Sequence, residues 1–199
     1  MHIRMDFKPA EKELRASKRC FERMQSARSY EEYEESWCDF LNHLEKIFEK
    51  LNRACAPVKG KFSSLISREN MLRSTDPLLQ YLKQARNADT HSIQDIAQHI
   101  PARYGVGFNL RQGETSAYIE KMRFENGALM EYKGSHPLIL TFTPETVVVK
   151  EVENQKRRYP PPKTHLGKQL NTLHPTELAK LGIDFYQKLF EKVVANFEE

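Results

Sequence analysis

The most constraining feature of the sequence is a long amphipathic pattern between residues 30 and 54. Its apolar residues recur every three or four positions, the spacing that places side chains on one face of an α-helix. Ser29 followed by Glu32 is a typical capping pair in front of such a helix. A stripe this wide needs a cover of other helices or a sheet, so the pattern predicts a packed helical region. The stripe consists of Tyr30, Tyr33, Trp37, Phe40, Leu41, Leu44, Ile47, Phe48 and Leu51.

Helices are also expected before and after this stretch. Residues 8–28 have helically spaced apolar positions, and Asp76 followed by Pro77 is a strong helix-start signal. The helix that begins at Pro77 is expected to run into the segment from Arg86 to His91. Beyond it, an apolar spacing predicts either a continuation or a second short helix that ends at Pro101. That spacing consists of Ile93, Ile96, Ala97 and Ile100.

After Pro101 the apolar period changes from helical to alternating, which predicts β-strands. Asn126-Gly127 is a good hairpin turn between two such runs, and we expect an antiparallel β-meander of four or five strands. Pro175 then begins an amphipathic last helix. The predicted class is α+β, with a helical bundle over 1–101. The meander and a C-terminal helix, which packs on the sheet or returns to the bundle, occupy 102–199.

Composition favours an ordinary globular protein in a reducing compartment. The formal net charge of +4 permits contact with RNA without requiring it. The three cysteines, Cys20, Cys38 and Cys55, lack the spacing of a zinc site or a disulfide framework. No apolar run is long enough to cross a bilayer. We therefore expect a cytoplasmic protein with no membrane contact, no cofactor and no metal.

The segment from Arg86 to His91 holds the candidate chemistry. It combines a permanently charged guanidinium, the amide of Asn87 and a titratable imidazole. These groups suffice in principle to cleave a phosphodiester without a metal, because the histidine transfers protons and the arginine binds phosphate oxygens. Positions five apart on a helix differ by roughly 140°, so convergence needs a groove or a dimer seam. The alternative is that Arg86 pairs with Asp89 on a solvated helix face.

The same segment resembles the Arg-polar-x-x-x-His signature of the HEPN superfamily (higher eukaryotes and prokaryotes nucleotide-binding). The preceding run from Leu78 to Ala85 is similar to the family's third helix, and the aromatic-rich helix around Trp37 is similar to its second. The resemblance covers about residues 1–101 and does not cover the strands.

The resemblance implies an all-α bundle that forms a homodimer, with two motifs meeting in one cleft. Many members are metal-independent ribonucleases that act as toxins or in antiviral defence, which implies RNA as substrate and an antitoxin protein as a partner. By position, the catalytic residues would be Arg86, Asn87 and His91. The alternative is a non-catalytic HEPN-like module that binds nucleotide or RNA, or that dimerises.

Overall fold

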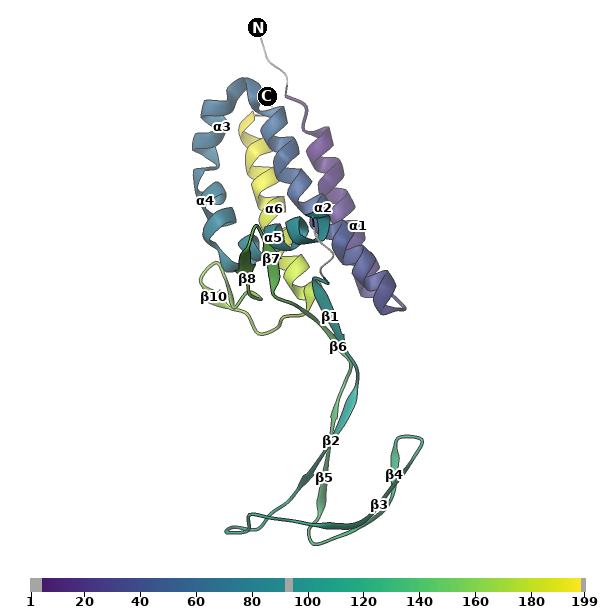
Figure 1. The fold of residues 1–199 in the computed structure, drawn as a ribbon. Helices are drawn as coiled ribbons and strands as arrows, with labels where there is room; N and C mark the ends of the chain where they lie inside the picture. The colour runs from purple at the N-terminus through teal and green to yellow at the C-terminus, as the bar shows by residue number, and fades with distance from the viewer. Residues whose placement is uncertain (1–4, 92–94, 198–199) are drawn as a thin grey trace. The chain divides into compact units, whose positions relative to one another are not determined.

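The chain is an α+β protein. The computed structural model describes residues 5–91 and 95–197, and for Thr90 and His91 it describes only the backbone (Figure 1). The helices are α1 (Lys8–Ser26), α2 (Tyr30–Ala54), η1 (a 3-10 turn, Ala56–Val58), α3 (Lys59–Leu65), α4 (Ser67–Thr75), α5 (Pro77–His91) and α6 (Pro175–Phe197). The strands are β1 (Ala97–Ile100), β2 (Arg103–Phe108), β3 (Ile119–Glu125), β4 (Ala128–Gly134), β5 (Leu138–Thr143), β6 (Thr146–Val149), β7 (Val152–Asn154), β8 (Arg157–Tyr159), β9 (Thr164–His165) and β10 (Lys168–Gln169).

The described residues form two compact units. One comprises the described parts of Met1–His99 and Val147–Glu199, and the other comprises Ile100–Thr146. The helices all belong to the first unit, because α6 returns to contact α1, α2 and α5. Figure 1 shows α1, α2 and α6 alongside one another. The C-terminal helix therefore returns to the helical bundle, which is one of the two outcomes expected for it.

Helix α2 forms the centre of the helical unit, as its apolar stripe predicts. Ser29 caps its first turn, since the Ser29 hydroxyl accepts a hydrogen bond of 3.1 Å from the backbone N–H of Glu32. Trp37 and Phe40 are completely buried and stack with ring centroids 5.6 Å apart. Burial of large apolar side chains such as these contributes about 1.5–3 kcal/mol each. The stripe is therefore core, and not a platform for stacking bases.

Helix α6 approaches α2 and α5 at a glycine. A Cβ atom added at Gly182 would lie 2.9 Å from Cδ1 of Leu82 and 3.2 Å from Cδ2 of Leu44. The 2.9 Å contact is shorter than real Cβ atoms make, so any side chain at position 182 requires the terminal methyl groups of Leu82 or Leu44 to move. This contact fixes α5 against the rest of the unit.

A buried ion pair joins α4, α2 and α6. Arg73 is 5% exposed, and its Nη2 donates to Oε1 of Glu45 at 2.5 Å. Its Nε donates to the hydroxyl of Tyr186 at 3.0 Å, and its guanidinium lies 3.4 Å from the ring centroid of Phe48. Burial raises the pKa of the Tyr186 hydroxyl to about 12, although the Arg73 charge acts in the opposite direction, so the hydroxyl is a neutral donor and acceptor.

The start of α5 is fixed by a second buried carboxylate. Asp76 precedes Pro77, and its Oδ1 accepts a hydrogen bond of 3.0 Å from the N–H of Leu79, which confirms the predicted helix start. The same carboxylate contacts Nδ1 of His165 at 2.9 Å and accepts from the N–H of Leu166 at 2.6 Å. One side chain therefore caps α5 and ties it to the β9–β10 hairpin.

The strands do not form the expected meander. They pair in nested antiparallel order, β1 with β6, β2 with β5, and β3 with β4, and the short hairpins β7–β8 and β9–β10 are separate. The tight turn at Asn126 and Gly127 is confirmed, with φ angles of 49° and 78°. Residues 109–118 are too long a connection for a tight turn, so β2 is free to pair with β5 instead of β3.

The short helix expected before Pro101 is also wrong. Ala97–Ile100 is strand β1, and Ile93 lies outside the described residues. The hydroxyl of Tyr30 donates to the carbonyl of Ala97 at 2.9 Å, and the N–H of Lys150 donates to the carbonyl of Ile96 at 3.1 Å. Partners distant in sequence therefore bind the carbonyls that a helix would have used internally.

The close approach at Gly182 can be tested with a matched pair of glycine substitutions. Gly182→Ala forces Leu82 or Leu44 to move, whereas no atom lies within 4 Å of a Cβ added at Gly60 in α3. We expect Gly182→Ala to lower the free energy of unfolding by about 1–3 kcal/mol relative to Gly60→Ala. Urea titration measures both. Equal stability of the two variants would contradict the packing argument.

The buried ion pair gives a second stability prediction. Arg73→Met leaves the Glu45 carboxylate buried without its guanidinium, and we expect a loss of about 3–5 kcal/mol. The double variant with Glu45→Leu should recover most of that loss, because no charge is left unpaired. The control is Arg15→Met, which removes an exposed pair with Glu11 and should cost at most about 0.5 kcal/mol.

Candidate functional site

Helix α5 presents the candidate residues, and its buried side fixes its orientation. Leu78, Leu82 and Ala85 are buried against the other helices. Tyr81 is 1% exposed, and its hydroxyl donates to the carbonyl of Lys150 at 2.7 Å. These contacts prevent rotation of α5 about its axis. The remaining face, which includes Arg86, is half-buried.

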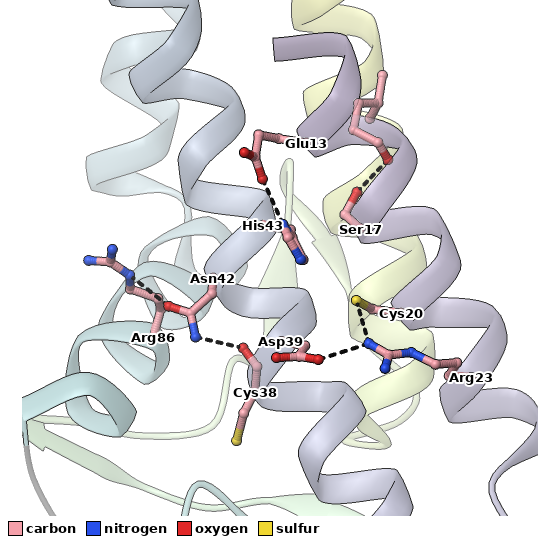
Figure 2. A network of polar contacts seen from close by, with 10 residues as sticks. Glu13, Ser17, Cys20, Arg23, Cys38, Asp39, Asn42, His43 and Arg86 are labelled. Atoms are coloured by element: carbon pink, nitrogen blue, oxygen red, sulfur yellow. Dashed lines mark hydrogen bonds and ion pairs between the residues drawn. The ribbon is translucent and has the colours of Figure 1, made fainter. Parts of the chain in front are cut away.

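Arg86 is held by two neutral amide side chains. Its Nε donates to Oδ1 of Asn42 at 3.3 Å, and its Nη1 donates to Oδ1 of Asn87 at 3.3 Å. Asn42 belongs to α2, and its Nδ2 donates to the carbonyl of Cys38 at 3.1 Å (Figure 2). The structure therefore brings Arg86 and Asn87 together, and it adds Asn42 as the group that orients the guanidinium.

His91 is the last residue of α5, and its side chain lies outside the described residues. The backbone places position 91 one helical turn beyond Asn87 and on the same helix as Arg86. The prediction that the imidazole joins Arg86 in one site stays a prediction.

Asp89 contacts the neighbouring helix. Its carboxylate hydrogen-bonds the thiol of Cys38 on α2. Burial first, and then this hydrogen bond, raise the pKa of the Cys38 thiol well above its usual range. Asp89 therefore helps to attach the end of α5 to α2, and it is not only a member of a solvated face.

The opposite flank of α2 carries a second polar cluster. Nδ1 of His43 lies 2.6 Å from Oε2 of Glu13, and Arg23 contacts Asp39 at 2.8 Å. Figure 2 shows these pairs on the side of α2 that faces α1, whereas Asn42 points to Arg86 of α5. His43 is half-buried, and its ring is hydrogen-bonded to the Glu13 carboxylate. A hollow of about 470 Å³ beside the cluster is lined by Ala16, Arg19, Cys20, Glu22, Arg23, Ser26 and His43.

The two flanks of α2 differ in what they can bind. On the α1 side, each charged group of the cluster has a partner of opposite sign, so an incoming anion would have to displace a carboxylate. On the α5 side, the amide oxygens of Asn42 and Asn87 accept hydrogen bonds from Arg86 and help to orient its guanidinium. An oriented cation of this kind suits a phosphate group, to which arginine forks through two N–H groups.

Asn42 is the site residue that the sequence did not reveal. It lies 44 positions before Arg86 in the chain. It belongs to a helix whose apolar stripe dominates its pattern, and nothing local distinguishes it from other polar positions of that helix. Only the packing of α5 on α2 shows its role.

Other kinds of site receive no support. Across residues 5–91 and 95–197, no group of three or more metal-binding side chains is close enough to hold an ion. Burial raises the pKa of the Cys20 thiol, and it raises that of Cys55 to about 11. With Cys38 shifted in the same direction, none of the three thiols is activated as a nucleophile.

Comparison of the chain with protein-family models, with curated proteins and with solved structures finds no match. Among the helices of the described residues, none is both long enough and apolar enough to span a membrane. The site must therefore be interpreted from its own geometry.

The shifted thiol pKa values predict slow alkylation. A rise of about two pKa units lowers the thiolate fraction about a hundredfold at a given pH. We expect iodoacetamide to label Cys20, Cys38 and Cys55 at least ten times more slowly in the native protein than in urea at pH 8. The labelling rate should rise as the pH is raised. Mass spectrometry locates the labels, and a native thiol that reacts as fast as the unfolded chain would contradict this account.

Proposed function

We propose that the protein is a metal-independent endoribonuclease of HEPN type, with Arg86, Asn87 and His91 as its catalytic residues. The single observation that carries the proposal is the Arg86 guanidinium, which Asn42 and Asn87 fix by hydrogen bonds of 3.3 Å each. Lys83 lies one turn before it on α5 and adds a second half-buried positive charge. Such a pair of cations favours binding of an RNA phosphate.

In the proposed reaction, a ribose 2′-hydroxyl attacks the adjacent phosphorus. One base accepts the hydroxyl proton as the new P–O bond forms, and the P–O5′ bond breaks as the leaving oxygen takes a proton. The products are a 2′,3′-cyclic phosphate and a 5′-hydroxyl. His91 carries out a proton transfer, because an ordinary imidazole titrates close to neutral pH. Arg86 stabilises the negative charge that builds up on the phosphate oxygens.

The size of each contribution can be bounded. A positioned general acid or base accelerates a reaction about 10²–10⁴-fold. A preorganised donor to the developing charge contributes about 10²–10³-fold. Asn42 is a positioning residue, since it orients Arg86 and is not expected to touch the substrate. The resemblance to HEPN proteins supports a site built from two copies, with an antitoxin as a further partner if the protein is a toxin.

The second candidate function is an RNA- or nucleotide-binding module without catalysis, and the same fixed guanidinium favours it. Under this alternative, affinity falls steeply with salt because phosphate contacts release counterions. Arg86→Ala would weaken binding, while His91→Ala would leave it unchanged. The two functions therefore predict different effects of one histidine substitution.

The deciding experiment measures cleavage of a mixed RNA in EDTA by the purified full chain. We expect the wild type to produce ends with a cyclic or 3′ phosphate. Arg86→Ala and His91→Ala should each lower the rate by at least about 10². Equal rates for wild type and His91→Ala would exclude the catalytic proposal.

Two matched controls are available on α2. Arg53 is an exposed arginine at the far end of that helix, so Arg53→Ala should leave the rate unchanged. His43 lies on the α1 side of α2, and His43→Gln should also cleave normally. Loss of cleavage with His43→Gln, but not with His91→Ala, would show that the reacting imidazole had been assigned to the wrong residue.

A further inference from the structure

Basic residues are concentrated in the β7–β8 hairpin and in the segment that follows it. Residues 154–171 contain no Asp or Glu. The rest of the chain holds 26 basic and 27 acidic residues, so the net charge of +4 comes from this stretch. A basic segment of this kind is typical of a surface that binds a polyanion such as RNA. Its basic residues are Lys156, Arg157, Arg158, Lys163 and Lys168.

The β7–β8 hairpin lies directly against α5. Asn154, the last residue of β7, donates from its Nδ2 to Oε1 of Gln84 on α5 at 2.7 Å. Val152 of the same strand is completely buried, and Tyr159 of β8 packs against the core. Figure 1 shows β7 and β8 beside α5, and all three belong to the helical unit. The hairpin is therefore anchored next to the helix that carries Arg86.

The strand register places Arg157 on the side of the hairpin that faces α5. Gln155 and Lys156 form the tight turn, with φ angles of 50° and 63° that are positive at both central residues, as in a type I′ turn. Asn154 is opposite Arg157, and opposite residues of an antiparallel pair point to the same side. Because Asn154 reaches Gln84, Arg157 also lies on the α5 side, with Lys156 next to it in the turn.

Arg158 lies on the other side of the hairpin, where carboxylates surround it. It is opposite Glu153 in the register, and its Nε lies 3.8 Å from the carboxylate of Glu153 and 3.9 Å from that of Glu151. Within the part of the chain that the structure describes, no carboxylate forms an ion pair with Lys156 or Arg157. The charge of Arg158 is therefore partly neutralised, whereas the two cations on the α5 side can bind an anion.

A polar face of α5 lies between the hairpin and Arg86. Successive residues of a helix turn by about 100°, so Gln84 and Arg86 point about 200° apart. Gln84 contacts the hairpin, and Arg86 contacts α2. Lys83 and Asn87 lie on the arc between them that is only half-buried. Residues 77–88 contain two basic residues and no acidic one, so the whole arc is positive or neutral.

We infer that an RNA strand runs across this face of α5, from Arg86 to the turn of the β7–β8 hairpin, where Lys156 and Arg157 bind further phosphates. The inference rests on the proposed function of Arg86 and adds a second contact region to it. The two regions lie on opposite flanks of one helix, whose diameter with side chains is about 10–12 Å. A mononucleotide reaches only one flank, whereas a strand of several nucleotides reaches both. The substrate class is therefore an extended RNA strand.

The side chains of this face favour RNA over an anionic membrane. Besides its cations, the face carries the amides of Gln84, Asn87 and Asn154, and amides hydrogen-bond phosphate oxygens and base edges. A surface that binds a membrane also inserts large apolar side chains into it. Residues 153–158 contain none.

Fluorescence anisotropy with a labelled RNA tests the inference on the full chain. The probe is a strand of about ten nucleotides with 2′-O-methyl riboses, which cannot be cleaved, at about 100 mM salt in EDTA. We expect Lys156→Ala with Arg157→Ala to raise the dissociation constant at least about tenfold. The slope of log affinity against log salt concentration should also fall by about 0.7 for each phosphate contact that is lost.

The matched control removes the same number of charges elsewhere. Arg158→Ala with Arg53→Ala takes away the ion-paired arginine of the hairpin and the exposed one of α2, and it should change the dissociation constant less than about twofold. Urea titration confirms that both double variants remain folded. Equal weakening by the two double variants would overturn the inference, as would no weakening by either or a wild type that does not bind the probe.

Cross-linking locates the strand independently of affinity. With 4-thiouridine in the RNA, we expect mass spectrometry to find cross-links both on α5 and on residues 154–158. Cross-links on α5 without any on the hairpin would overturn the inference. So would flotation with phosphatidylserine vesicles that depends on Lys156 and Arg157 while RNA binding does not, because the hairpin would then bind lipid.

Failure of this inference is distinguishable from failure of the proposed function. If the hairpin variant binds the probe weakly but the wild type cleaves no RNA, the catalytic proposal fails and the RNA path stands. If the wild type cleaves RNA and the hairpin variant binds the probe as the wild type does, the path is wrong and the catalytic proposal stands.

Discussion

The close packing of α6 on α2 and α5 is the constraint on which the helical unit depends. The C-terminal helix is separated from α2 by more than a hundred residues of chain, yet it lies in the middle of the unit and contacts α1, α2 and α5. Gly182 permits this close approach, because a side chain there would displace the methyl ends of Leu82 or Leu44. Without α6, the part of the α2 stripe that packs on it would face water.

The same constraint determines what α5 presents. Asp76 fixes where α5 begins, and the buried hydroxyl of Tyr81 fixes its rotation. Arg86 then faces Asn42 and not the core. An arginine on a free helix face samples many rotamers, and ordering it on a ligand costs conformational entropy. Here much of that ordering is completed before a phosphate arrives, which is the condition for effective charge stabilisation.

The sequence predicted the parts of the fold that local signals determine. The stripe of α2, the Asp76 cap, the Asn126-Gly127 turn and the start of α6 at Pro175 were all correct, since each depends on neighbours a few residues away. The nested strand order and strand β1 were missed because both depend on pairing between distant segments. A helical spacing before Pro101 was misleading, since tertiary hydrogen bonds outweigh local propensity there.

The candidate site also combines contacts that local sequence predicts with contacts that depend on distant segments. Arg86 and Asn87 are neighbours in sequence, so their association could be predicted from the motif, whereas Asn42 and the Asp89–Cys38 contact could not.

The two units differ in how far they bury their apolar side chains. Each has elements that are apolar on one side, and such a side must be removed from water. The helical unit solves this within one chain, where Trp37 and Phe40 are fully buried. In the unit Ile100–Thr146 the strands pair only two by two, so they form no second layer within that unit and no comparable core.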